Sequence, residues 1–478
     1  MSATRASAPR QPSTLGELKA AGYRRRTVKE EMRANLLRRL GEGGDLFPGI
    51  IGFEDSVIPA VENAILAGQD IVFLGERGQA KTRMARLLVG LLDPEIPIVA
   101  GSELNDDPLA PVSPYGKALV AERGDDTPIE WIGPDRRYAE KLATPDITIA
   151  DLIGEVDPIK VAEGRHLSDE LVIHYGLIPR ANRGIFAINE LPDLAERIQV
   201  GLFNILEERD VQIRGFTIRL PLDLFVVASA NPEDYTSRGR IITPLKDRLG
   251  SQIRTHYPRT LEDEIAIMEQ ERSVFEGGLD GPPIAIPDFM RELVAELTHL
   301  ARRSPEISQR SGVSVRVSIA NLETLAANAY KRALRLGEDE AVPRISDLGA
   351  LVASTTGKIE LETLGDETPE ERVVDRLVTK ATHVVFSRRV EPDELDDVVE
   401  AFDEGLVVET GESVPSREYV RWAREIPGMR EPLAALGAVG SPPMVASGVE
   451  FLLEGLHLHR RLNKERGAPG GGGGLYRR

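Results

Sequence analysis

Residues 75–82 read Gly-Glu-Arg-Gly-Gln-Ala-Lys-Thr, and they lie between the apolar run Ile71–Leu74 and a segment with helical periodicity. A strand followed by such a turn and then a helix places backbone amides and a lysine where they can bind phosphate oxygens. The alternative, a glycine-rich turn with a solvated lysine, would not need this strand-to-helix context. The turn therefore predicts a site for ATP or GTP.

The residue types within the turn suggest individual roles. Lys81 is expected to reach the β- and γ-phosphates and the Thr82 hydroxyl to ligate Mg²⁺, while Gly75 and Gly78 let the backbone approach the anion. Ala80 stands where the usual pattern has glycine. We expect the backbone to tolerate it, because helix entry does not need a positive φ. The predicted nucleotide-binding residues are Gly75, Glu76, Arg77, Gly78, Gln79, Ala80, Lys81, Thr82 and Arg83.

The composition is that of a globular protein. The chain has 478 residues, 41% of them hydrophobic, and no cysteine, which excludes disulfides and thiolate metal sites. About three domains are expected for this length. No window approaches a membrane span and no secretory signal is apparent, so we expect no membrane association and a cytoplasmic location.

The charge is unevenly distributed. The net charge is −18, yet residues 1–45 hold ten Lys/Arg against five Asp/Glu, about +5. An acidic body disfavours nucleic acid as a partner. The basic segment is either an arm that contacts an acidic partner or another subunit, or an ordinary solvated helix.

Five apolar runs have the length of strands, and the long segments between them predict a parallel sheet with crossover helices. Alternation around a glycine also predicts a hairpin at 211–220, just before the fourth run. The chain is therefore expected to be α/β, with a parallel sheet flanked by helices. The five runs are Ile71–Leu74, Ile96–Ala100, Ile185–Ile188, Leu224–Ala228 and Ile253–Tyr257.

Domain boundaries follow from the helical pattern after Pro258 and from a new helix start near Thr368-Pro369. The expected parts are a basic helical arm over 1–45, a phosphate-loop core over 46–258, a helical lid over 259–367, a mainly helical C-terminal domain over 368–466 and a flexible glycine-rich tail over 467–478.

Polar residues end the third and fourth apolar runs. Glu190 is the predicted base that activates the attacking water. Asn189 stands where an aspartate usually holds the Mg²⁺ water shell. Its neutral amide can still hydrogen-bond a metal-bound water, so weaker Mg²⁺ binding or slower turnover is expected. Asn231, after the fourth run, is predicted to contact the γ-phosphate or to position the water.

Two arginines are candidates for sensing the nucleotide. Arg248 precedes the last apolar run, where it can act as an arginine finger on a neighbouring subunit's nucleotide. A local surface pair with Asp247 fits the spacing equally well. Arg316 opens a helix after the core and can close over the phosphates. The alternative for Arg316 is an ordinary surface arginine.

Together these features resemble the AAA+ ATPases, and within them the branch of the magnesium-chelatase ATPase subunit and the MoxR-type ATPases. The resemblance covers about residues 46–365. It implies a Walker A loop at 75–82, a Walker B strand ending at Glu190, a first sensor at Asn231, an arginine finger at Arg248, a second sensor at Arg316, an insert near 150–180 and a pre-sensor hairpin at 211–220. The motifs that carry it are Ala80-Lys-Thr82, Leu177–Gly184 leading into Asn189-Glu190, Ala230-Asn-Pro232 and Leu245–Leu249.

The resemblance implies an ATP-driven ring, with a hexamer expected, that uses ATP and Mg²⁺ to insert a metal or to remodel a partner. It also implies a partner with a von Willebrand factor A domain. One alternative is a MoxR-type chaperone unrelated to tetrapyrroles. Another is a weakly hydrolysing regulatory ATP-binding subunit, which Asn189 motivates. A transcription activator is disfavoured, because the sequence has neither a Gly-Ala-Phe-Thr-Gly-Ala run nor a basic helix-turn-helix.

Overall fold

The computed structural model describes residues 11–156, 173–208, 220–231, 241–273, 281–308, 311–362, 369–466 and 473–478. The chain forms two compact units. The sheet unit comprises Met1–Gly75 and Ala80–Thr255, and the helical unit comprises Glu76–Gln79 and His256–Arg478. The predicted hairpin lies outside the described residues except for Leu220, and so do residues 157–172 of the predicted insert.

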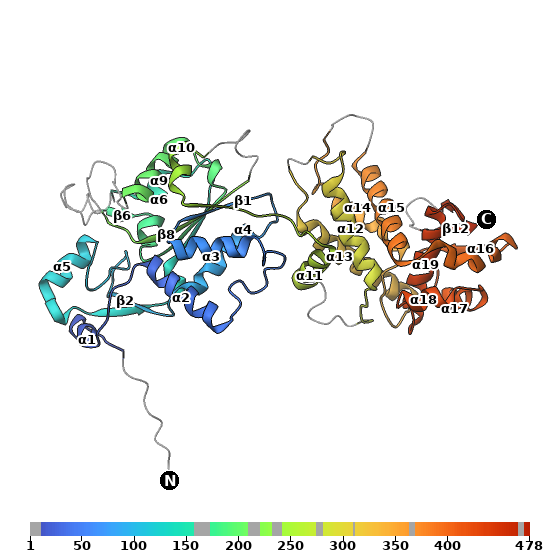
Figure 1. Cartoon of the computed structure of the whole chain (residues 1–478), viewed down its shortest axis with the longest axis horizontal. Helices are drawn as coiled ribbons and strands as arrows, with labels where there is room; N and C mark the ends of the chain where they lie inside the picture. Colours follow the sequence, from blue (N-terminus) through green and yellow to red (C-terminus); the bar gives the residue numbers. More distant parts are fainter. Residues whose placement is uncertain are drawn as a thin grey trace, which may run out of the picture. The chain divides into compact units, whose positions relative to one another are not determined.

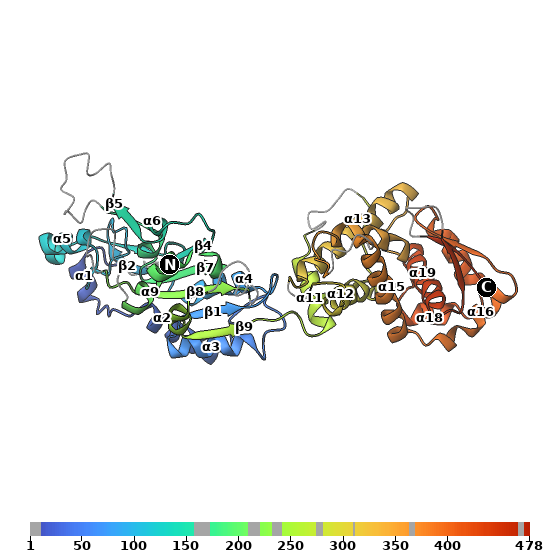
Figure 2. The same cartoon turned by 90° about the horizontal axis from the view of Figure 1, so that it is seen from above.

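The sheet unit is built on five parallel strands in the order β4-β7-β8-β1-β9 (Figure 2). Every pairing between neighbouring strands is parallel, which confirms the expected α/β class. The strands are β1 (Ile71–Leu74), β4 (Tyr138–Leu142), β7 (Gly184–Asn189), β8 (Leu224–Ala230) and β9 (Ser251–Arg254).

The prediction that Ile96–Ala100 forms part of this sheet is wrong. β2 (Ile96–Val99) pairs antiparallel with β3 (Ile129–Ile132) in a separate two-stranded sheet. The place beside β7 belongs to β4, an edge strand whose sequence Tyr-Ala-Glu-Lys-Leu is too polar to read as a buried strand. Another antiparallel pair joins β5 (Gly154–Val156) to β6 (Ile173–Tyr175).

Helices cover both faces of the parallel sheet (Figure 1). Successive side chains of a strand point to opposite faces, and β1, β7 and β8 are buried on both. One face packs against α2 (Val28–Glu42), α3 (Val57–Ala67) and α4 (Lys81–Leu87). The other face packs against α9 (Glu196–Glu208) and α10 (Thr243–Arg248). Such two-sided coverage explains why these strands read as continuous apolar runs.

The described part of the predicted basic arm is built into the sheet unit. Met32 and Leu36 of α2 have no exposed surface and join the core on the sheet face that α2, α3 and α4 cover. The Glu31 carboxylate forms an ion pair of 2.7 Å with the buried Arg137 guanidinium. Helix α2 therefore contributes both apolar contacts and a buried ion pair to the sheet unit.

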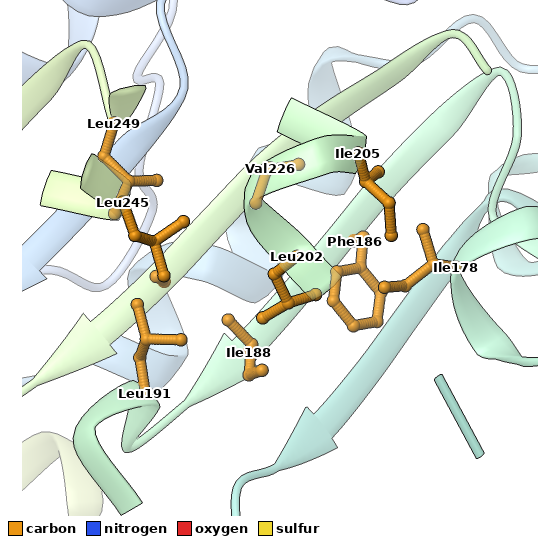
Figure 3. A pocket seen from close by; sticks show the side chains of 10 residues that line it. Ile178, Phe186, Ile188, Leu191, Leu202, Ile205, Val226, Leu245 and Leu249 are labelled. Carbon is orange, nitrogen blue, oxygen red and sulfur yellow. The ribbon is translucent and has the colours of Figure 1, made fainter. Parts of the chain in front are cut away.

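An apolar pocket lies between the sheet and the helices α9 and α10 (Figure 3). Phe186 contributes to it from the sheet, Leu202 from α9 and Leu245 from α10. Its lining side chains are all apolar, so it belongs to the core that holds α10 in place.

The helical unit has one hydrophobic core, which extends from Met268 to Tyr476. The predicted separation between a lid over 259–367 and a C-terminal domain over 368–466 is therefore not reflected in separate cores. Buried residues of α12, α15 and α19 (Figure 1) share it, and α12 and α19 are buried over most of their circumference. The helices are α11 (Leu261–Glu271), α12 (Asp288–Arg303), α13 (Val315–Leu336), α14 (Leu351–Thr355), α15 (Glu370–Arg389), α16 (Asp396–Asp403), α17 (Ser416–Glu425), α18 (Arg430–Ala435) and α19 (Pro442–Leu458).

The prediction of a flexible tail over 467–478 is wrong for its last residues. β12 (Gly474–Arg477) is the central strand of an antiparallel sheet between β10 (Val408–Thr410) and β11 (Asn463–Arg466). Tyr476 is 1% exposed, and its burial with the core explains why this end is ordered. Residues 467–472 of the predicted tail lie outside the described residues.

Within the described residues, no helix combines the length and the apolar character needed to cross a membrane.

The remaining elements are short. The other helices are α1 (Leu15–Ala20), α5 (Pro114–Arg123), α6 (Ile149–Leu152), α8 (Leu177–Arg180), η1 (Leu88–Leu91), η2 (Gly124–Asp126), η3 (Pro134–Arg137), η5 (Leu191–Asp193), η7 (Ile345–Ala350) and η8 (Pro392–Leu395).

Candidate nucleotide site

The carboxyl ends of β1, β7 and β8 meet at one edge of the parallel sheet. Leu74 is aligned with Ala230, and Ile188 with Ala228. The Gly75 amide continues this alignment by donating to the Ala230 carbonyl at 3.1 Å. In open α/β sheets the crevice outside these strand ends is where ligands bind.

Lys81, Asn231 and Glu190 form a chain of hydrogen bonds at this edge. The Lys81 ammonium donates to the Gly75 carbonyl and, at 2.8 Å, to Asn231 Oδ1. Asn231 Nδ2 in turn donates to Glu190 Oε2 at 3.1 Å. Lys81 is only 7% exposed, and a buried ammonium requires such partners. Three residues predicted from separate motifs are therefore in contact through one another.

The expectation about Ala80 is wrong. Ala80 has φ 54° and ψ 14°, in the left-handed region, where it caps the start of α4. A positive φ is what favours glycine at this position, because a Cβ there costs roughly 1 kcal/mol or more. The loop thus adopts a conformation that favours glycine in spite of its alanine.

Glu190 also has a left-handed backbone, with φ 56° and ψ 48°. It directly follows β7, and its amide donates to Ser229 Oγ at 3.2 Å. A residue other than glycine in this conformation is costly and persists where the surroundings impose it, commonly at functional sites. The conformation turns the chain away from the strand immediately after Asn189.

Asn189 joins the loop to the sheet edge. Its Oδ1 accepts hydrogen bonds from Thr82 Oγ1 at 3.4 Å and from Ser229 Oγ at 3.3 Å. Its Nδ2 donates to Glu140 Oε1 at 2.8 Å. The two predicted Mg²⁺ residues, Thr82 and Asn189, are therefore adjacent, and both offer oxygen, the donor that Mg²⁺ prefers.

Glu140 is the residue of this site that sequence reasoning missed. It lies on β4 and accepts hydrogen bonds from Arg86 at 2.8 and 2.9 Å and from the Tyr138 hydroxyl at 2.9 Å. These bonds, Arg86 first, lower the pKa of the Glu140 carboxyl below its usual range. No clear signal for it is present in the sequence, because Tyr-Ala-Glu-Lys-Leu lacks the apolar–polar alternation of a half-buried strand.

Residues 76–79 of the loop pack within the helical unit. Gln79 Oε1 accepts from the Glu76 amide at 3.1 Å, and the Arg77 guanidinium lies 3.3 Å from Glu360. Gly78 has φ 78°, and a Cβ on it would lie 2.0 Å from Ser314 Oγ. Gly78 is therefore required both for its backbone conformation and for this close approach.

Arg316 lies in the first turn of α13, two residues after Ser314, which closely contacts Gly78. Ser314 caps the helix by accepting a hydrogen bond from the Arg316 amide at 3.2 Å. The Arg316 side chain is exposed. The structure thus brings the start of α13 to loop residue Gly78, while the sensing role of Arg316 stays a prediction.

The other predicted arginines are on helices of the sheet unit. Arg83 is exposed on α4. Arg248 pairs with the Glu207 carboxylate of α9, and its guanidinium lies 5.5 Å from the centre of the Phe203 ring. The alternative of a local pair with Asp247 is therefore replaced by a pair with α9. The role of Arg248 on a neighbouring subunit stays a prediction.

Among the residues that the structure describes, no group of three or more His, Asp or Glu side chains could hold a metal ion. Mg²⁺ commonly binds to one or two protein groups together with substrate phosphates and water. Thr82 and Asn189 fit that pattern. A metal here would accordingly depend on a bound nucleotide.

Comparison with known proteins finds distant relatives, several of which are magnesium-chelatase subunits. The magnesium-chelatase subunit ChlI of a Nostoc species is 27% identical over 283 residues, which cover 57% of this chain and 70% of that protein. Magnesium-chelatase subunits from another cyanobacterium, Cereibacter sphaeroides, Euglena gracilis and plants match at 27 to 28% identity. No protein-family model matches the chain.

Two solved structures are similar at low identity. A chain of the complex between subunits BchI and BchD of magnesium chelatase, based on a cryo-EM reconstruction, is 20% identical with a TM-score of 0.34, covering 72% of this chain and 95% of that one. NtrX from Brucella abortus in complex with ATP is 16% identical with a TM-score of 0.40, covering 84% and 72%. At these TM-scores the likeness supports no inference about ligands or partners of this chain.

Proposed function

Because this chain is a distant homologue of the magnesium-chelatase ATPase subunits, we propose that it is an ATPase whose nucleotide is bound by residues 75–83. The observation that carries the proposal is the hydrogen-bond chain from Lys81 through Asn231 to Glu190. It joins a phosphate-binding lysine to a carboxylate at the edge where parallel strands end, and hydrolysis needs both groups.

Each residue has a distinct proposed task. Lys81 exchanges its bond to Asn231 for phosphate oxygens of the nucleotide. Asn231 then holds the attacking water, and Glu190 orients and activates it. Thr82 and Asn189 are the residues that would hold Mg²⁺, which when bound neutralises charge on the phosphates.

We also propose that the protein works as a ring of identical subunits, with a hexamer expected. Arg248 would then reach a neighbouring subunit's nucleotide. Its side chain is 41% exposed, and an exposed pair such as that with Glu207 is worth about 1 kcal/mol or less. Breaking the pair with Glu207 so that Arg248 can bind a phosphate therefore costs little free energy. Arg316 would respond to the nucleotide from the start of α13.

The proposed output is metal insertion or remodelling of a partner, with a von Willebrand factor A domain protein as the expected partner. Distant homology to magnesium-chelatase subunits supports this direction. The finer alternative is a MoxR-type maturation chaperone that handles no tetrapyrrole. The two differ in the partner and not in the nucleotide chemistry.

A second candidate function, a regulatory ATP-binding subunit with slow turnover, is favoured by one observation. The position beside Thr82 is an amide, Asn189, and not a carboxylate. An amide brings no charge to Mg²⁺, so binding of the nucleotide would be retained while hydrolysis slows.

Turnover of ATP by the purified chain with Mg²⁺ separates these candidates. The Lys81→Ala variant is the control, because it removes the ammonium that would bind the phosphates. We expect turnover in the unchanged protein and none above background in the variant. Equal rates in both, with ATP binding retained by the unchanged protein, would support the regulatory candidate and contradict the ATPase.

The partner is identified by capture with the Glu190→Gln variant in the presence of ATP. This variant is expected to hold ATP without hydrolysing it and so to retain partners of the ATP state. The Lys81→Ala variant serves as the matched control. A retained von Willebrand factor A domain protein together with a tetrapyrrole enzyme favours metal insertion, and another client favours the chaperone.

A further inference from the structure

Asn189 carries an amide, and an amide has two chemically different ends. Its oxygen can accept a hydrogen bond from a metal-bound water, whereas its NH₂ can only donate. Asn189 is 9% exposed, and its oxygen side faces Thr82 Oγ1 and Ser229 Oγ. An asparagine could replace the usual aspartate near Mg²⁺ only if something fixes which end faces the loop.

Glu140 is placed to fix that orientation. In the described part of the chain, each of its side-chain hydrogen-bond partners donates to it: two Arg86 nitrogens, the Tyr138 hydroxyl and Asn189 Nδ2. An ionised carboxylate accepts and never donates. The 2.8 Å contact therefore requires Asn189 to turn its NH₂ toward β4, which leaves its oxygen toward Thr82.

We propose that Glu140 is a positioning residue that holds the Asn189 amide oxygen toward the Mg²⁺ site beside Thr82. The inference rests on the proposed function, because it assigns a task within the same nucleotide site. Glu140 acts through Asn189 and touches neither nucleotide nor metal.

The surroundings of Glu140 make its carboxylate hard to replace by an amide. A glutamine at 140 has one NH₂, which would face a donor in either orientation. If that NH₂ faces Asn189, the Asn189 amide is driven to flip its own NH₂ toward Thr82. If it faces Arg86 Nε and the Tyr138 hydroxyl, the bond from Arg86 Nε is lost and the remaining bond from Arg86 Nη2 no longer goes to a charged group, so the side chain is held less firmly.

The first test measures how much Mg²⁺ the protein needs to bind nucleotide. Binding of ATP carrying a fluorescent methylanthraniloyl group is titrated with MgCl₂ and, separately, measured in EDTA. We expect Glu140→Gln to raise the Mg²⁺ concentration for half-maximal binding by roughly 10- to 100-fold, the usual effect of losing a group that orients a metal ligand. Binding in EDTA should be unchanged.

The matched control is Glu130→Gln. Glu130 of β3 pairs with Arg136 of η3 at 2.8 Å and has no part in the hydrogen bonds described for the loop, so this variant also breaks a Glu–Arg pair. It should leave the Mg²⁺ requirement unchanged. A merely structural role of Glu140 would weaken binding in EDTA and with Mg²⁺ alike.

The second test is rescue by Asn189→Asp. A carboxylate has oxygen at both ends and needs no orienting partner. In the Glu140→Gln background, Asn189→Asp should return the Mg²⁺ requirement to that of the unchanged protein or below. With Glu140 present, the same change places two carboxylates in contact, and little or no gain is expected.

The outcomes separate this inference from the function on which it rests. An unchanged Mg²⁺ requirement in Glu140→Gln, or no rescue by Asn189→Asp, overturns the positioning role while the nucleotide site stands. Absence of nucleotide binding in the unchanged protein at any Mg²⁺ concentration overturns the proposed function itself.

Discussion

Two regions of the molecule bring charged side chains together, and they do so differently. In the helical unit, Arg332 and Asp347 are 1% and 0% exposed, lie 3.0 Å apart and are joined by Glu338 and Arg344. At the edge of the sheet, Lys81 and Glu190 are separated by the neutral amide of Asn231. Buried ion pairs in direct contact hold elements of the fold together. Charged groups that are linked through a neutral amide can exchange that hydrogen bond for one to a ligand.

The buried charges of the helical unit are also bonded to segments far from them in the sequence. Arg344 donates to the Val414 carbonyl at 2.9 Å, and the Ser346 amide donates to Glu450 at 2.7 Å. These bonds tie η7 to the segment before α17 and to α19. Breaking a pair of this kind leaves a buried charge without a partner, which is costly. The comparison can be tested in both regions.

The largest expected effect is on turnover in Arg248→Ala. An arginine finger contributes about 10³- to 10⁵-fold to turnover, so we expect a loss of this order with ATP binding preserved. Steady-state ATPase rates and ATP titration measure the two quantities. Glu207→Gln, which breaks the same surface pair, should leave turnover unchanged.

A trans role makes a further demand on Arg248→Ala. Mixed with Lys81→Ala subunits, it should regain part of its rate, because each variant supplies what the other lacks. Failure of the mixture to gain activity would count against a site shared between subunits.

The next effect is on turnover in Glu190→Gln. Removal of the base that activates water should slow hydrolysis about 10²- to 10⁴-fold, while ATP stays bound. Single-turnover kinetics and nucleotide titration measure this. If the variant loses ATP binding, Glu190 has a structural role like the buried charges of the helical unit, and the contrast between the regions fails.

A comparable free-energy change, but in stability, is expected for Asp347→Asn. Asp347 accepts from Arg332, Asn328 and the Arg344 amide, and one of these donors would face the new NH₂. We expect the free energy of unfolding to fall by about 3–5 kcal/mol, measured by urea denaturation.

The control for that variant is Glu418→Gln, which removes the exposed pair with Arg421 and should cost about 1 kcal/mol or less. A small effect of Asp347→Asn would mean that the buried ion pairs do not hold the helical unit together. ATP binding at zero denaturant should be unchanged in both variants.

The smallest effect is expected for Ala80→Gly. Glycine relieves the left-handed strain at φ 54° but makes the unfolded chain more flexible, so the net gain should stay under about 1 kcal/mol. The melting temperature measures it. Loss of more than about 1 kcal/mol would indicate that Ala80 does not hold this conformation.

The sequence predicted those parts of the site that follow from a regular pattern. Glu190 and Asn231 directly follow apolar strands, Lys81 begins the helix after the turn that follows β1, and the carboxyl ends of parallel strands meet at one edge. Glu140 was not predicted as a site residue, because β4 is a polar edge strand that the sequence pattern does not indicate. The left-handed conformation of Ala80 was not predicted, because it depends on the geometry of the whole turn.

Contacts between segments that are far apart in the sequence could not be predicted from local sequence patterns. β12 carries glycine and arginine and looks like a loose end, but it is inserted between β10 and β11. β10 precedes it by more than sixty residues. Likewise, nothing local to η7 indicates that Ser346 bonds to Glu450. Such contacts decide where a domain ends.

A crystal structure with a slowly hydrolysed ATP analogue and Mg²⁺ tests the central claim most directly. We predict phosphate oxygens within hydrogen-bond distance of Lys81 Nζ, Mg²⁺ next to Thr82 Oγ1, and the Glu190 carboxylate facing the γ-phosphate. An analogue bound elsewhere with the loop at 75–82 empty, or a Glu190 side chain turned away from the phosphates, would contradict it.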